Sequence, residues 1–75
     1  MEERILKLLD DIDEEIRDYG GSNLFEAGLF DSFLVMDLVS ELENEFGIEI
    51  DAKYVVEDNF KSKDAIFSLM RRLLG

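Results

Sequence analysis

Apolar residues recur at intervals of three and four in three separate segments, and this spacing restricts the fold more than any other feature. The segments cover residues 3–18, residues 32–46 and the residues after Ser62. An interval between three and four matches the 3.6 residues of a helical turn, so the pattern predicts three amphipathic helices. Pro is absent, and the glycines at 20, 21, 28 and 47 lie between the segments.

Residues at the ends of these segments support the helix boundaries. A helix over residues 3–18 begins among acidic residues and is stopped by Gly20-Gly21. The central helix has Asp31 or Ser32 as a possible N-cap and Gly47 as its C′ residue. Ser62 is the predicted N-cap of the last helix, whose final turn carries two arginines.

The connections contain more apolar residues than solvent-facing loops usually do. Four large apolar side chains lie in residues 20–31, which predicts a loop packed over the core with a short helical turn near Leu24–Ala27. Ile48–Ile50 reads as an extended connection that buries both isoleucines, and one short helix fits around Tyr54–Asp58. The predicted fold is an all-α, four-helix bundle in one domain, residues 1–75, with three longer helices, one short helix and a long first loop.

The composition excludes most catalytic chemistry. Cys and His are both absent, which removes thiolate zinc sites, Cys nucleophiles and the commonest general base. Phosphate-binding glycine loops and the EF-hand spacing are missing as well. We therefore predict that the chain is not an enzyme and holds no metal of its own.

The net charge of −11 restricts the partners. Nucleic acid and anionic membranes would be repelled, whereas a protein with a basic surface would be attracted. The longest apolar run is Phe33–Met36, far too short to cross a membrane, and no apolar leader follows Met1. These features predict a cytoplasmic monomer.

One aromatic residue departs from the pattern of the central helix. Phe33 lies opposite the apolar stripe, on a face otherwise made of Asp37, Ser40, Glu41 and Asn44. Ser32 and Met36 lie at the rim between the two faces. Two interpretations are open: Phe33 and the Ser32 hydroxyl face a partner, or Phe33 folds against the preceding loop and Ser32 only caps the helix.

The sequence from Leu24 to Phe33, ending in Asp-Ser-Phe, resembles an acyl or peptidyl carrier protein. The downstream Glu43-x-x-Phe-Gly-Ile lies at the family's distance, and the resemblance extends over nearly the whole chain. It implies that Ser32 receives a covalent 4′-phosphopantetheine arm from coenzyme A, transferred by a magnesium-dependent phosphopantetheinyl transferase. The thiol of that cofactor would carry an acyl or aminoacyl group as a thioester, so a chain without Cys could still serve acyl transfer.

The resemblance also implies roles for the neighbours of Ser32. Asp31 would assist the metal and coenzyme during modification, in addition to capping the helix. Phe33, Met36, Asp37 and Glu41 match the side of the family's second helix that faces partners. Those partners would be the transferase, a loading ligase for acyl or aminoacyl groups, and a downstream acyltransferase or synthase, each with a basic surface.

One motif bears on the subclass. Fatty-acid carriers usually have one residue between the loop Gly and Asp-Ser, followed by Leu. Here Leu29 and Phe30 intervene and Phe33 follows, which is closer to D-alanyl and free-standing aminoacyl carriers. Three functions stay open: an acyl carrier such as one for fatty acid biosynthesis, a D-alanyl carrier for teichoic acid D-alanylation, and a cofactor-free interaction module that uses Phe33.

Overall fold

The computed structural model describes residues 1–75 and is all-helical, as the periodicity predicts. Its elements are α1 (Glu2–Ile12), α2 (Glu15–Asp18), α3 (Ser32–Phe46), the 3₁₀ turn η1 (Ala52–Tyr54), α4 (Glu57–Phe60) and α5 (Lys63–Leu74). The three longer helices, the long first loop and the short fourth helix are confirmed. None of the helices is long and apolar enough to cross a membrane.

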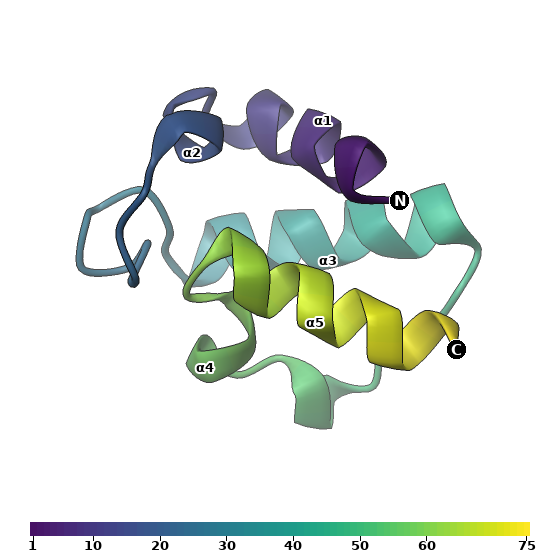
Figure 1. The fold of residues 1–75 in the computed structure, drawn as a ribbon. Helices are drawn as coiled ribbons and strands as arrows, with labels where there is room; N and C mark the ends of the chain where they lie inside the picture. The colour runs from purple at the N-terminus through teal and green to yellow at the C-terminus, as the bar shows by residue number, and fades with distance from the viewer.

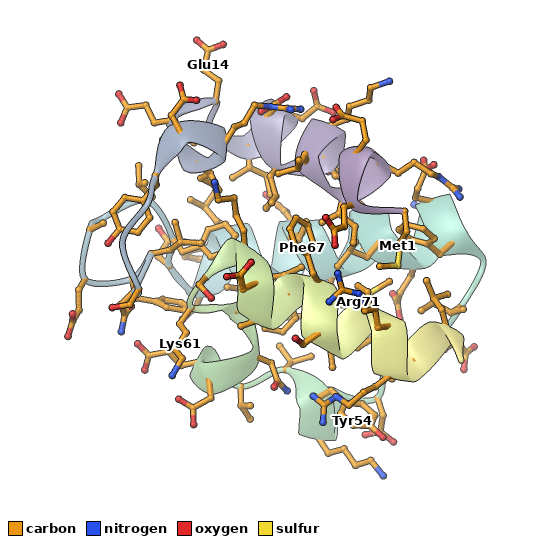
Figure 2. The ribbon with its side chains drawn as sticks, in the orientation of Figure 1. Met1, Glu14, Tyr54, Lys61, Phe67 and Arg71 are labelled. Atoms are coloured by element: carbon orange, nitrogen blue, oxygen red, sulfur yellow. The ribbon has the colours of Figure 1, made fainter.

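The three long helices enclose a single apolar core. Figure 1 shows α1 running alongside α3, with α5 in front of α3 in this view and the two chain ends on the same side of the bundle. Phe67 of α5 points into this interior (Figure 2). All fifteen buried residues are hydrophobic and form one cluster, so the predicted apolar stripes meet in one place: Ile5, Leu9, Ile16, Leu24, Phe30, Val35, Leu38, Val39, Leu42, Ile50, Phe60, Ile66, Phe67, Leu69 and Met70.

The prediction of one helix over residues 3–18 is wrong, because the helix ends at Ile12 and a short α2 begins at Glu15. Asp13 is extended, with φ −163° and ψ 114°, and its carboxylate accepts a hydrogen bond from the amide of Glu15 at 2.9 Å. The turn exposes Glu14 at the corner, where it points away from the fold (Figure 2). The hydrogen bond from the Glu15 amide to the Asp13 side chain holds Asp13 in a non-helical conformation, so α1 cannot continue through this residue.

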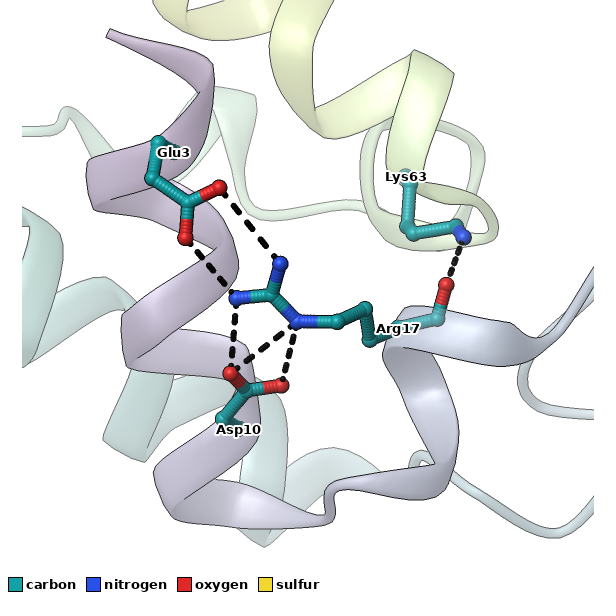
Figure 3. Close-up of polar contacts among 4 residues, drawn as sticks. All are labelled: Glu3, Asp10, Arg17 and Lys63. Atoms are coloured by element: carbon teal, nitrogen blue, oxygen red, sulfur yellow. Dashed lines mark hydrogen bonds and ion pairs between the residues drawn. The ribbon is translucent and has the colours of Figure 1, made fainter.

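The break also folds Arg17 back over α1. Its guanidinium contacts Asp10 at 2.7 Å and Glu3 at 3.0 Å, as Figure 3 shows. In an unbroken helix, Arg17 and Glu3 would lie about 21 Å apart along the axis. The Lys63 ammonium donates to the Arg17 carbonyl, so α5 holds the same corner.

The later connections follow the prediction with two differences. Ile48–Ile50 is an extended segment; Ile50 is buried but Ile48 is only half-buried. The expected short helix is divided into η1 and α4. Gly47 ends α3 with φ 66°, a left-handed conformation in which its amide and that of Ile48 both donate to the Glu43 carbonyl.

Candidate functional site

Ser32 is the first residue of the longest helix, and it is exposed. Asp31 precedes it in an extended conformation, and its side chain accepts a hydrogen bond from the Leu34 amide at 2.9 Å. Of the two predicted N-caps, Asp31 is therefore the one used. The Val35 amide donates to the Asp31 carbonyl, whereas the amides of Ser32 and Phe33 have no protein acceptor. The serine hydroxyl thus lies beside two free N–H groups at the positive end of a helix dipole.

The loop before Ser32 is packed, as the sequence predicts. Leu24 and Phe30 are buried, and the rings of Phe25 and Phe30 lie 5.9 Å apart at 59°. Residues 24–28 form a turn rather than a helix, and Gly28 has φ 80°. The Leu24 amide donates to the Lys61 carbonyl at 2.6 Å, which ties the loop to the junction of α4 and α5. The position of Ser32 is therefore set by the core and not by a free loop.

An open groove of about 430 Å³ begins at Ser32. It runs between the first turns of α3 and the segment that joins η1 to α4. All its lining residues are hydrophobic apart from Ser32 and Glu57: Phe25, Ser32, Val35, Met36, Val55, Val56 and Glu57. A flexible apolar group attached at Ser32 could lie in this groove without entering the core.

The predicted partner-facing residues divide into two groups. Phe33 is 85% exposed, and Met36 and Asp37 are exposed on the same side of α3. The alternative that Phe33 folds against the loop is therefore wrong. Glu41 differs from the other three because it is half-buried, and one of its carboxylate oxygens is buried without a hydrogen-bond partner. The structure brings Phe33, Met36 and Asp37 together near Ser32, and Glu41 lies one turn beyond Asp37 with a less exposed side chain.

The stretch of chain that contains Ser32 is negative. No Lys or Arg occurs between Arg17 and Lys53, whereas the same segment contains nine acids. These are Asp18, Glu26, Asp31, Asp37, Glu41, Glu43, Glu45, Glu49 and Asp51. Arg4 comes from α1 and pairs with Glu45 at 2.7 Å, but it does so at the far end of α3. A partner that approached Ser32 would therefore meet the Asp31 and Asp37 carboxylates beside the exposed apolar residues Phe33 and Met36, with no base on this helix.

The only clearly shifted pKa values belong to the corner between α1 and α2, not to the Ser32 site. Hydrogen bonds from Arg17, and then its charge, lower the pKa of Glu3. A hydrogen bond from Arg17 also lowers the pKa of Asp10, and the two carboxylates raise the pKa of Arg17 itself. This group is a structural clamp on the surface, and its carboxylates are neutralised by a cation of the same chain.

Sequence reasoning missed the second wall of the groove. Val55, Val56 and Glu57 face Ser32 only because the segment after η1 folds back against α3. The local sequence does not predict this contact, because Val55-Val56-Glu57 is compatible with an ordinary surface turn. In the structure Val56 is 48% exposed, and an exposed large apolar residue is a general indication of a contact site, but exposure cannot be read from the sequence.

Comparison with known proteins gives one family. The family model described as "Phosphopantetheine attachment site" matches residues 3–59, a range that includes α3, the groove and all of α1 but its first residue. The D-alanyl carrier protein of Streptococcus mutans is 32% identical over 83% of this chain and 80% of its own length. The D-alanyl carrier protein of Staphylococcus xylosus is 30% identical over 95% of this chain and 94% of its own length. The D-alanyl carrier protein of Leuconostoc mesenteroides is 28% identical over 100% of this chain and 97% of its own length. No solved structure matches.

Proposed function

The chain belongs to the phosphopantetheine-binding carrier family, and from this premise we propose that Ser32 is the residue that carries the arm. The cofactor of this family is covalently bound 4′-phosphopantetheine, which supplies a thiol that holds cargo as a thioester. The observation that carries the proposal is the exposed Ser32 hydroxyl at the start of α3, beside two free backbone amides.

The residues around Ser32 fit this group. A phosphodiester on the hydroxyl would lie within reach of the unpaired amides of Ser32 and Phe33, where the helix dipole favours an anion. The groove accepts the apolar part of the arm without rearrangement of the core. Asp31 has a double role in this proposal: it caps α3, and its carboxylate helps to position the metal and coenzyme during modification.

We propose an aminoacyl cargo, with D-alanine as the leading candidate. Two observations support it over a fatty acyl chain. The relatives are named D-alanyl carrier proteins and match most of this chain. The motif Gly28-x-x-Asp31-Ser32-Phe33 resembles the same subclass.

Partners dock, in this proposal, on the exposed side of α3. Phe33 and Met36 provide an apolar contact, and Asp37 provides charge at its edge. The phosphopantetheinyl transferase, the loading ligase and the downstream acyltransferase would present basic surfaces to this face. Glu41 contributes long-range attraction more than contact, because it is half-buried.

Intact-mass measurement tests the attachment. After incubation with coenzyme A, magnesium and a broad-range phosphopantetheinyl transferase, the wild-type chain should gain the mass of one arm. Ser32→Ala should gain nothing, whereas Ser40→Ala, which removes an exposed hydroxyl from the same helix, should gain the arm normally. Absence of modification in the wild type, or modification of Ser32→Ala, contradicts the proposal.

A cofactor-free interaction module is the second candidate function. The 85% exposure of Phe33 favours it, because a large aromatic side chain on an acidic surface indicates a docking point with or without an arm. The two functions differ in whether Ser32 is needed. An interaction module would keep its activity in Ser32→Ala, and a carrier would lose it.

A further inference from the structure

Glu57 is the one acidic residue in the groove that begins at Ser32. It opens α4 directly after Val56, and it is exposed at the groove's edge. None of the ion pairs or side-chain hydrogen bonds in the structure involves it. The groove therefore has an apolar wall and one unpartnered carboxylate.

The bases nearest to Glu57 in the chain have other contacts. Lys53 lies over the ring of Tyr54 at 5.2 Å, and Lys61 approaches Asp58 at 3.9 Å. The charged residues that precede and follow Ser32 in the sequence are all acids, because no Lys or Arg occurs between Arg17 and Lys53. A cation bound in this groove would therefore form the ion pair that Glu57 lacks within the chain.

We propose that Glu57 is a specificity residue that favours cargo with a free ammonium group, so that the carrier itself contributes to the choice of an aminoacyl cargo. The inference rests on the proposed function, because it requires an arm on Ser32. The arm is long and flexible enough to fold back along the groove, with its methyl groups against Val55 and Val56. Its cargo then lies near the Glu57 carboxylate.

The attraction between an exposed carboxylate and an ammonium is weak in free solution. Attachment changes this balance, because both groups belong to one molecule and their effective concentration is high. An aliphatic cargo of the same size gains nothing from Glu57. A cargo that ends in a carboxylate is repelled by Glu57 and by the neighbouring acids.

Alanyl and propionyl cargo provide a matched test, because they differ only by the ammonium group. Each is attached to Ser32 by the transferase, from a coenzyme A analogue in which an amide replaces the thioester and prevents hydrolysis. Intact mass first establishes that the arm is present. NMR then follows the ¹⁵N-labelled alanyl ammonium through a pH titration, together with the backbone amides of residues 55–57.

The expected result is that the wild type raises the pKa of the alanyl ammonium above its value in Glu57→Gln by about 0.2–0.5 unit. Glu49→Gln is the control, because it removes the same charge from an exposed site outside the groove. It should leave most of that increase in place. The amides of residues 55–57 should shift more with alanyl than with propionyl cargo.

Equal pKa values in Glu57→Gln and Glu49→Gln would overturn the inference, because the effect would then be one of net charge alone. Equal amide shifts for the two cargoes would also overturn it. Failure to attach any arm is a different result, visible in the mass spectrum before the titration. It would remove the proposed function and this inference with it.

Discussion

The Asp31 carboxylate accepts a hydrogen bond from the Leu34 amide at 2.9 Å, across the residue proposed to carry the arm. This bond occupies one of the free N–H groups of the first turn and fixes where α3 begins. It leaves the amides of Ser32 and Phe33 open. The Asp31 carboxylate thus has two roles, the capping of α3 and the proposed role in modification, and suitable variants separate the two roles.

Asp31→Asn should keep the stability of the fold but slow the modification of Ser32. Asn caps helices about as well as Asp does, so the melting temperature should change little. The negative charge that would position the metal and coenzyme is lost, so the modification rate should fall. Thermal unfolding by circular dichroism and the initial rate of mass gain measure the two effects.

Asp31→Ala is the matched control, because it removes the cap as well as the charge. It should cost about 1 kcal/mol of unfolding free energy in addition to slower modification. If Asp31→Asn is modified at the wild-type rate, Asp31 is a cap and nothing more.

Phe33→Ala should leave the fold intact and weaken docking. The ring is 85% exposed, so its loss should change the unfolding free energy by less than about 0.5 kcal/mol. Its absence should lower kcat/KM of the transferase for this carrier about tenfold, as expected of an apolar contact at an interface centre. Phe60→Ala, at a buried ring, should instead destabilise by about 3–5 kcal/mol. Unchanged kcat/KM in Phe33→Ala would show that partners dock elsewhere.

The features that the sequence predicts well are those with local causes. The sequence predicts the central helix over 32–46, and the structure has it over Ser32–Phe46. The Asp31 cap and Gly47 each act within a few residues of their own end of the helix, and the apolar spacing repeats between them. Ser62 caps α5 through the Ala65 amide for the same reason. Helical spacing also places Phe33 opposite the apolar stripe, but its exposure is decided by the structure, because the spacing leaves a fold against the loop open.

The features that it predicts poorly depend on distant contacts. The break after Ile12 has a local component in Asp13, but it is stabilised by Arg17 reaching Glu3 and by Lys63 holding the same corner. These residues are too far apart in the chain for a periodic pattern to relate them. The groove wall at 55–57 is missed for the same physical reason.

Added salt should raise the melting temperature, because the chain carries a net charge of −11. The acids at the α1–α2 corner do not all contribute equally. Asp10 is paired with Arg17, whereas the other acids of this corner have no ion-pair partner. These are Asp11, Asp13, Glu14, Glu15 and Asp18, and we test the exposed pair Asp11 and Glu14. Between about 0.01 M and about 1 M NaCl, screening should add roughly 1 kcal/mol, or about 4–8 °C.

The double variant Asp11→Asn/Glu14→Gln provides the control for the salt effect. It should melt higher than the wild type at low salt and at nearly the same temperature at high salt. A melting temperature that does not depend on salt in either protein would show that repulsion between these acids is minor.

Arg17→Gln should destabilise the fold near neutral pH, and this difference should disappear in acid. Arg17 holds the pKa values of Glu3 and Asp10 below their ordinary values, through its hydrogen bonds first. The ion pairs of Arg17 therefore stabilise the fold fully at any pH above the pKa values that Glu3 and Asp10 have in the unfolded chain. This stabilisation is lost as the pH falls through the lower pKa values that the two carboxyl groups have in the folded chain. The difference in melting temperature between the two proteins should be constant from about pH 7 to about pH 5 and shrink below about pH 4. Lys7→Gln removes the same charge from α1 without breaking an ion pair, so it should change stability less. Its acid transition should be smaller, because Lys7 lowers the pKa of Glu3 by its charge alone and to a lesser extent than Arg17 does. A difference for Arg17→Gln that persists unchanged at about pH 2 would show that Arg17 acts through packing of its side chain and not through the two carboxylates.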